Sequence, residues 1–139
     1  MARVKLKRRL SYPPEMVWAA LTDSDQMANW LMPNDFRPEV RHVFQFKTKP
    51  APGFDGIVDC EVLEIDPLKE LAISWKGGGI DTVVRFLLTP VEGGTSLELI
   101  QDGFAIKDVF PYFILGQGWK KILRKNLPMA IASIDDRSM

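Results

Sequence analysis

The sequence predicts an α+β fold in which a curved, six-stranded antiparallel sheet wraps around a long C-terminal helix. Three observations lead to this prediction: an alternating strand pattern at the N-terminus, five further strand-like segments separated by turns, and a helical pattern at the C-terminal end. Several of the turns are too short for a crossover helix, so neighbouring strands are expected to be antiparallel. One strand, two helices, five strands and a long helix form an order typical of α+β domains with helices on one face of a sheet.

The first third of the chain combines one strand with two short helices. Residues 4–10 alternate apolar and basic side chains, which is the pattern of a half-buried strand. Pro13 and Pro14 end this strand, and proline suits the first turn of the helix that follows. A second short helix is expected from Asp23 to Leu31, with a Ser or Asp side chain as its cap.

Proline- and glycine-rich turns separate the five strands expected in the middle of the chain. The run Gly77-Gly78-Gly79 lies between two of them, whereas a phosphate-binding loop leads from a strand into a helix. We therefore interpret this run as a hairpin turn. The expected strands are Val40–Thr48, Gly56–Ile65, Glu70–Lys76, Thr82–Pro90 and Thr95–Gln101.

The C-terminal part is expected to be a long helix that begins near Trp119. One helical face is apolar except for Asn126, and the opposite face is basic. Pro128 falls on the outer side and is expected to bend the helix so that its apolar face wraps around the sheet. The apolar face consists of positions 119, 122, 123, 126, 127, 130, 131 and 134.

Composition limits the functions that the chain can have. With 139 residues, it has the length of one domain, expected to span residues 1–139. Lys plus Arg (18) balances Asp plus Glu (18), so nothing favours nucleic-acid binding, and no apolar run is long enough to span a membrane. The single cysteine excludes an intramolecular disulfide, and the charged N-terminus is unlike a secretory signal, so we expect a cytoplasmic location.

A series of short motifs covers nearly the whole chain. They are Pro13 to Asp23, Trp30, Gly56 to Pro67, Leu71 to Trp75, Gly94-Thr95-Ser96-Leu97, Asp102-Gly103-Phe104 and Gly118-Trp119, with Arg8 in the first strand. In this order and spacing they resemble the family named after the activators of the Hsp90 ATPase. Pro13 to Asp23 resembles the opening helix of that family, Trp30 resembles the tryptophan that ends its second helix, and Arg8 stands where the family usually has an arginine.

The resemblance implies the helix-grip fold of the START-like superfamily, also known as SRPBCC or Bet v 1-like, whose members often enclose a cavity between the sheet and the long helix. One segment departs from the family pattern. The strand near Val40 usually opens with a Gly-Gly pair, but here the chain reads Glu39-Val40-Arg41-His42. The eukaryotic co-chaperones also carry an additional N-terminal domain, so the resemblance does not by itself imply co-chaperone activity.

Strand alternation places many aromatic side chains on the inward face of the sheet. They either fill the core or line a cavity for a small apolar or aromatic molecule, and both interpretations remain open here. The predicted ligand-binding residues are Trp30, Phe44, Phe46, Cys60, Trp75, Phe86, Phe104, Trp119 and Leu123. Arg8, His42 and Asn126 are polar candidates for the same cavity, because they stand on otherwise apolar faces and buried polar groups need partners.

The sequence offers little chemistry for catalysis. His42 and Cys60 are the only residues of their types, whereas a zinc site needs three or four such ligands. No metal, cofactor or catalytic residue is therefore predicted. Cys60 alternates in phase with Val58 and Val62 and is interpreted as a small buried hydrophobic residue.

The leading hypothesis is non-enzymatic binding of a small hydrophobic or aromatic ligand between the sheet and the C-terminal helix. The alternatives are an enzyme of the cyclase or dehydratase type that uses a cavity acid or base such as His42, and a protein-interaction module resembling the chaperone-activator domain. A chaperone partner has no further support in the sequence. The apolar stretch Phe110 to Phe113 has three open interpretations: a lid over the pocket, part of the core, or a contact in a homodimer.

Overall fold

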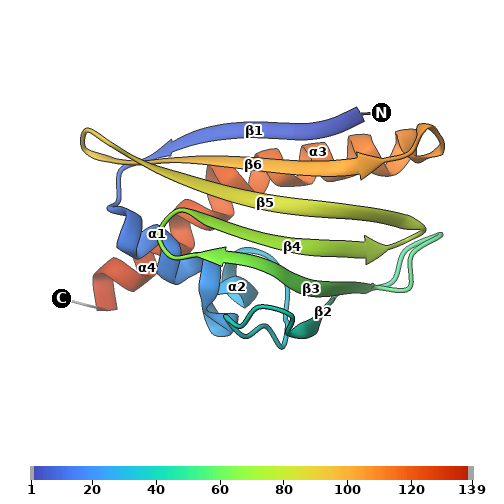
Figure 1. Cartoon of the computed structure of the whole chain (residues 1–139), viewed down its shortest axis with the longest axis horizontal. Coiled ribbons are helices and arrows are strands. Elements are labelled where there is room, and N and C mark those ends of the chain that lie inside the picture. The colour runs from blue at the N-terminus through green and yellow to red at the C-terminus, as the bar shows by residue number, and fades with distance from the viewer. Residues whose placement is uncertain (1, 138–139) are drawn as a thin grey trace.

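The computed structural model describes residues 2–137 and has the predicted helix-grip architecture (Figure 1). One six-stranded antiparallel sheet has the strand order β1-β6-β5-β4-β3-β2. Its strands are β1 (Ala2–Leu10), β2 (Val43–Lys47), β3 (Ile57–Asp66), β4 (Glu70–Gly77), β5 (Ile80–Val91) and β6 (Gly94–Phe104). The helices are α1 (Pro14–Thr22), α2 (Ser24–Trp30), η1 (Ile106–Asp108), α3 (Val109–Lys121), η2 (Ile122–Asn126) and α4 (Leu127–Arg137).

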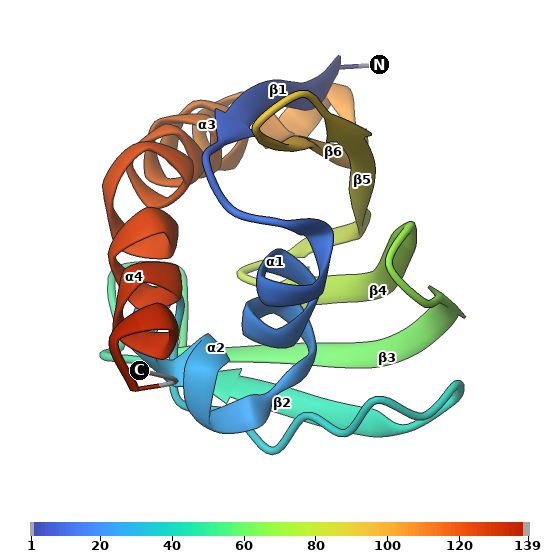
Figure 2. The same cartoon turned by 90° about the vertical axis from the view of Figure 1, so that its left-hand side faces the viewer.

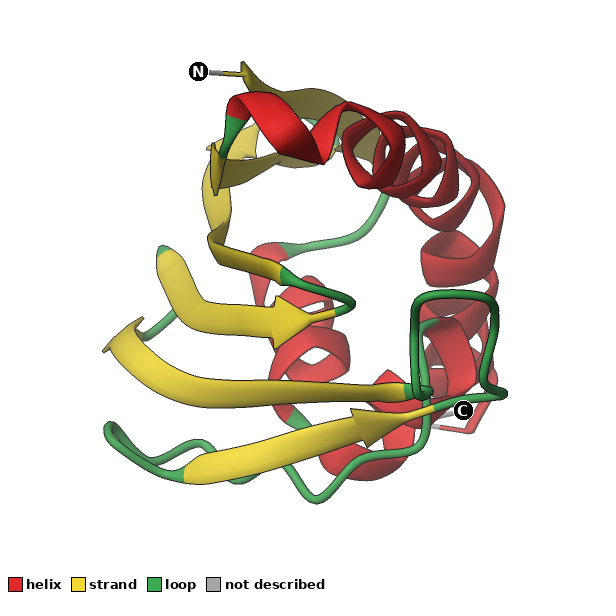
Figure 3. Ribbon diagram, turned by 90° about the vertical axis from the view of Figure 1, so that its right-hand side faces the viewer, coloured by secondary structure: helices red, strands yellow, loops and turns green. Residues whose placement is uncertain are grey.

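The sheet curves around the helices, which all lie on its concave side (Figures 2 and 3). The hairpin between β4 and β5 turns at Gly78 and Gly79, whose φ angles are both positive, as glycine permits in tight hairpin turns. The prediction that the glycine run is a hairpin turn is therefore confirmed. The helix α2 ends at Trp30, and Asp23 caps it by accepting hydrogen bonds from the N–H groups of Asp25 and Gln26.

The strand predicted from Val40 begins later, at Val43. The reason is Arg41, whose φ of 75° places it in the left-handed region that is unfavourable for residues with a Cβ atom. The backbone here still reaches β3, because Arg41 N–H donates to Val62 O over 2.7 Å and Val62 N–H donates to His42 O over 3.0 Å. The segment that departs from the family pattern is thus the one where an arginine adopts a backbone conformation suited to glycine.

The long helix begins at Val109, so the prediction that it starts near Trp119 was wrong. It is interrupted by the π-helical turn η2, in which Leu127 N–H donates to Ile122 O. Pro128 follows directly, and it can neither donate an N–H nor fit against the carbonyl four residues earlier. The helix bends between α3 and α4, as expected from Pro128 (Figures 1 and 2).

The apolar face predicted for this helix is confirmed. Trp119, Leu123, Leu127, Ala130 and Ile131 are buried against the sheet and the first two helices. The basic side chains on the opposite face, Lys120, Lys121, Arg124 and Lys125, are exposed. No helix in residues 2–137 is long and apolar enough to cross a membrane.

The strained backbone at Arg41 leads to a stability prediction. A left-handed conformation costs a residue with a side chain roughly 1–2 kcal/mol, and glycine recovers this at an entropic cost of roughly 0.5–1 kcal/mol. We expect Arg41→Gly to raise the free energy of unfolding by about 0.5–1 kcal/mol in urea denaturation. Arg41→Ala keeps the strain and removes the same exposed side chain, so it should change stability little. Equal effects of the two variants would contradict this account.

Candidate ligand pocket

A chain of buried hydrogen bonds joins the long helix to the middle of the sheet. Trp119 Nε1 donates to Gln101 Oε1 over 2.8 Å, and Gln101 Nε2 donates to Thr82 Oγ1 over 2.9 Å. Thr82 Oγ1 in turn donates to the backbone carbonyl of Trp75 over 2.9 Å. Both Gln101 and Thr82 are buried, so each polar group needs the partner it has. This chain fixes α3 against β6, β5 and β4.

Aromatic side chains fill the centre of the space between the sheet and the helix. The rings of Phe46 and Trp75 have centroids 5.4 Å apart, and those of Trp75 and Trp119 are also 5.4 Å apart. Phe86 packs against Trp119 at 6.1 Å and against Trp30 at 6.0 Å, in edge-to-face geometry. This continuous aromatic cluster forms the centre of the hydrophobic core.

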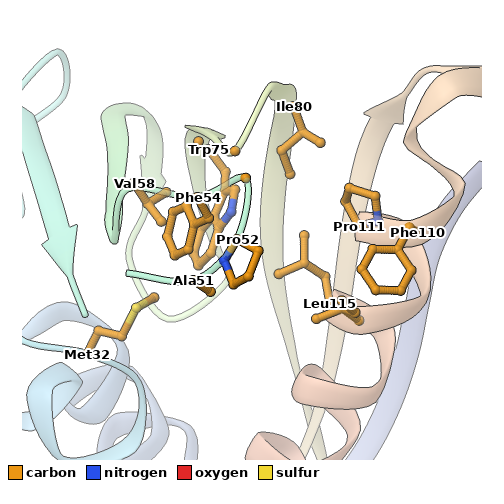
Figure 4. A pocket seen from close by; sticks show the side chains of 14 residues that line it. Met32, Ala51, Pro52, Phe54, Val58, Trp75, Ile80, Phe110, Pro111 and Leu115 are labelled. Carbon is orange, nitrogen blue, oxygen red and sulfur yellow. The ribbon is translucent and has the colours of Figure 1, made fainter. Parts of the chain in front are cut away.

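An apolar pocket of about 320 Å³ opens at one end of this cluster, between the start of α3 and the sheet. In Figure 4 Pro52, Phe54 and Trp75 lie on one side of it, and Phe110, Pro111 and Leu115 lie on the opposite side. The walls come from three segments far apart in the sequence. They are the loop residues 51–54, the β4–β5 hairpin with Gly77, Gly78 and Ile80, and the helix residues Phe110, Pro111, Ile114 and Leu115, supplemented by Met32, Val58 and Trp75.

The loop that forms one wall is positioned by its own hairpin and by the glycines of the next one. Ala51 and Phe54 exchange backbone hydrogen bonds of 2.9 Å, with Gly53 at a φ of 77° between them. A Cβ atom at Gly77 would lie 2.8 Å from Ile57 O and 3.4 Å from a ring carbon of Phe54. Glycine at position 77 is therefore what allows this close approach of the loop to β4.

The pocket wall contains no ionisable side chain, because its residues are Met, Ala, Pro, Gly, Phe, Val, Trp, Ile and Leu. Trp75 Nε1 is the single side-chain hydrogen-bond donor in this wall. Within residues 2–137, no cluster of three His, Cys, Asp or Glu side chains could hold a metal ion. The arrangement is suited to apolar contact, not to proton transfer or ion binding.

Comparison with known proteins places the chain in a family. The model of the family described as "Activator of Hsp90 ATPase homolog 1-like protein" matches residues 11–131. The chain belongs to this family. No protein among the curated sequences matches it significantly. The resemblance seen in the sequence motifs is thereby confirmed.

Solved structures of similar proteins share the fold over almost the whole chain. Protein MLL2253 from Mesorhizobium loti is 33% identical, with a TM-score of 0.88, and the match covers 95% of this chain and 98% of that one. Protein BH1534 from Bacillus halodurans is 24% identical, with a TM-score of 0.79 and coverage of 94% and 97%. CalU16 from Micromonospora echinospora is also 24% identical, with a TM-score of 0.77 and coverage of 97% and 79%.

Of the nine residues predicted to bind a ligand, Trp75 lines this pocket. The other eight are buried in the core around it. Trp30 is held there by a hydrogen bond of 2.8 Å from its Nε1 to Ala20 O, and Phe104 packs edge-to-face on Tyr112 at 5.4 Å. The remaining six are Phe44, Phe46, Cys60, Phe86, Trp119 and Leu123. Alternation found the inward face correctly, but the hollow lies beyond the aromatic cluster.

The three polar candidates do not line this pocket. Arg8 is exposed. His42 is partly buried and stacks on Phe44, and its Nε2 lies 2.9 Å from the backbone oxygen of Asp35. Asn126 is partly buried in the π-helical turn. Sequence reasoning missed Gln101 and Thr82, two of the buried polar residues on inward strand positions. It also missed the wall formed by the loop residues 51–54.

Cys60 is a buried free cysteine in β3. Burial, and secondly the negative charge of Asp59, raises the pKa of the Cys60 thiol above its ordinary value. The thiol is therefore protonated at neutral pH and is a poor nucleophile. This agrees with its interpretation as a small hydrophobic residue.

The apolar stretch at 110–113 is the first part of α3, and its residues have different environments. Phe110 and Pro111 line the pocket, and Tyr112 packs against the core through Phe104. Phe113 is 61% exposed and does not line the pocket. Together with Ile106, Val109, Phe110 and Ile114, Phe113 forms an exposed apolar surface beside the pocket, which we call the α3 apolar surface.

The hydrogen bond from Trp119 can be tested separately from its packing. Trp119→Ala should lower the free energy of unfolding by roughly 3–5 kcal/mol, as large aromatic truncations in cores do. Trp119→Phe keeps an aromatic ring but leaves Gln101 Oε1 without its donor, which should cost about 1–3 kcal/mol. Trp18→Phe, at a partly buried tryptophan outside this hydrogen-bond chain, should cost less in the same urea titration. A Trp119→Ala variant of nearly native stability would contradict the proposed role.

Proposed function

We propose that the protein binds a small apolar or aromatic molecule in the pocket between α3 and the sheet, without catalysing a reaction on it. The observation that carries this proposal is the pocket of about 320 Å³ with walls made of apolar side chains and glycine backbone. This volume lies at the lower end of the range for small-molecule sites, which is roughly 300–1,000 Å³. The ligand is therefore expected to be compact, of the size of one or two fused rings.

The shape of the walls supports binding of a flat ring. Trp75, Phe54 and Phe110 offer aromatic surfaces, and Pro52 and Pro111 add rigid apolar contacts. Rigid side chains lose little conformational freedom when a ligand binds, so more of the contact energy contributes to affinity. Phe110 is 73% exposed and borders both the pocket and solvent, which places it at the mouth through which a ligand would pass.

The positions of the titratable groups favour binding over acid–base catalysis. A general acid or base must lie within hydrogen-bond reach of the proton that it transfers. His42, the candidate named for an enzyme of the cyclase or dehydratase type, is not among the residues that line the pocket. Cys60 is buried in the core and its thiol stays protonated. These placements support a binding protein.

A pocket-filling variant tests the proposal. In thermal-shift and calorimetric titrations, tetralin and 1-tetralone should stabilise the parent protein, by about 2.7 kcal/mol at a hundredfold excess over the dissociation constant. Leu115→Trp should abolish this stabilisation, because Leu115 lines the pocket and a tryptophan there occupies it. Phe113→Trp introduces the same side chain two residues away, outside the pocket, and should keep the stabilisation.

The comparison of these two variants also shows where any probe binds. Stabilisation that survives in a folded Leu115→Trp protein would place the binding elsewhere and contradict the proposal. The proposal is also contradicted if neither probe stabilises the parent protein. Native mass spectrometry of the purified parent and of Leu115→Trp should show a co-purifying small molecule only in the parent.

A second candidate function, association with another protein chain, is favoured by the α3 apolar surface. Exposed apolar patches of this kind on monomers are commonly interaction sites. A second copy of this chain is the simplest partner, because one apolar surface can pack against its own symmetry mate. Chaperone interaction, which the family name suggests, would use a surface of the same chemistry.

Self-association is testable with a variant that leaves the pocket intact. Phe113→Gln replaces an exposed apolar side chain by a good helix former and should shift a dimer towards monomer in sedimentation equilibrium. Met129→Gln changes an equally exposed residue on α4, outside the α3 apolar surface, and should leave the distribution unchanged. A parent protein that is monomeric at all concentrations would exclude the homodimer.

A further inference from the structure

The indole N–H of Trp75 is the one polar side-chain group in the pocket lining, and it has no hydrogen-bond partner among the described residues 2–137. Trp75 is 4% exposed and lines the pocket wall. Among residues 2–137 no group accepts a hydrogen bond from its Nε1, although its backbone carbonyl is held by Thr82. The other two buried tryptophans each donate from Nε1 over 2.8 Å, Trp30 to Ala20 O and Trp119 to Gln101 Oε1.

The free N–H group of Trp75 is in contact with open space. Among residues 2–137, one side-chain nitrogen or oxygen atom is fully buried and lacks a hydrogen-bond partner, and this atom is Gln26 Oε1. Trp75 Nε1 also lacks a partner but does not belong to this fully buried class. Trp75 Nε1 is therefore not sealed inside the core. The rings of Phe46 and Trp119 pack against the indole in tilted geometry, and Trp75 also lines the pocket. The donor thus belongs to the pocket wall.

We propose that the ligand of this pocket is an uncharged molecule that carries an acceptor oxygen, such as a ketone, and that this oxygen accepts a hydrogen bond from Trp75 Nε1. The inference rests on the proposed function and narrows its ligand class. A buried indole N–H normally has a hydrogen-bond partner, because a buried donor without one costs free energy. A carboxylate or phosphate does not fit, because no basic side chain lines the pocket to offset its desolvation.

The geometry also makes Trp75 a selective donor. Its ring packs against Phe46 and Trp119, and its backbone carbonyl accepts a hydrogen bond from Thr82, so the N–H direction is restricted before a ligand binds. A single side-chain donor among otherwise apolar side chains helps to set the orientation of a ring system and favours ligands with oxygen at one position. A hydrocarbon of the same shape makes the apolar contacts but leaves this donor unpaired.

The first experiment uses the parent protein and two probes that differ by one carbonyl group, 1-tetralone and tetralin. The four tryptophans give four indole N–H signals in a ¹H–¹⁵N spectrum, and the Trp75 signal is assigned as the one missing in Trp75→Phe. We expect 1-tetralone to move this signal further downfield than tetralin does. The Trp30 and Trp119 signals, already hydrogen-bonded, should respond equally to both probes.

The second experiment is a cycle of affinities with Trp75→Phe. The ratio of tetralin to 1-tetralone dissociation constants should be about three- to tenfold higher in the parent than in Trp75→Phe, since the variant leaves the ketone oxygen without a donor. Tetralin binding shows whether the pocket of the variant is intact. If Trp75→Phe does not fold, the Trp75 indole signal is assigned through its through-space contacts with assigned neighbouring protons, and the parent spectra decide.

The outcomes separate this inference from the proposal on which it rests. If both probes bind the parent through the pocket but the Trp75 signal responds identically, the acceptor inference is wrong and the apolar binding function stands. The same follows if the affinity ratio is unchanged in Trp75→Phe. If neither probe binds the parent, the proposed binding function fails. If 2-naphthoate binds the pocket better than both probes, the binding function stands but the uncharged ligand class is wrong.

Discussion

The buried chain of hydrogen bonds from Trp119 through Gln101 and Thr82 to the Trp75 carbonyl determines how the long helix lies on the sheet. The hydrophobic effect is non-directional, so burial of apolar area alone specifies the position of a helix on a sheet less sharply than buried hydrogen bonds do. Each buried hydrogen bond contributes only about 0.5–1.5 kcal/mol when made, but a displacement that breaks one leaves buried polar groups unsatisfied at about 1–3 kcal/mol each. The hydrogen bonds therefore select one position of the helix, and hydrophobic burial supplies most of the stability.

The place of the pocket follows from that position. With Trp119 fixed over the centre of the sheet, the aromatic cluster of Phe46, Trp75, Phe86 and Trp119 fills the space beneath the helix. The helix also extends back to Val109, beyond this cluster, and there it faces the loop residues 51–54 across a gap. The pocket thus lies beneath the first part of α3, beyond the aromatic cluster, where no large core side chain of residues 2–137 fills the space between the helix and the sheet.

The fold and the helix face could be predicted because they depend on local periodicity. Apolar side chains recur every two residues in the strands and every three or four residues from Trp119 onward. The start of the helix could not, because residues 110–115 are almost continuously apolar and Gly116 and Gly118 lower the helical preference. Gln101 and Thr82 were detectable: both are polar on strand positions in phase with buried residues, Leu97 and Leu99 for Gln101 and Val84 and Phe86 for Thr82. The pocket wall formed by the loop residues 51–54 was not detectable from the sequence. It depends on the close approach of this loop to Gly77, which lies some twenty residues further along the chain.

The three buried tryptophans have different hydrogen-bond environments within one core. Trp30 and Trp119 use their indole N–H groups inside the protein, so each ties one element to another and has no donor left for a ligand. Trp75 is held through its carbonyl and its ring, and no acceptor for its N–H group lies among residues 2–137. A donor that is already oriented loses little entropy when an acceptor arrives. The same hydrogen-bond chain that positions the helix therefore also holds the one side-chain donor among the residues that line the pocket.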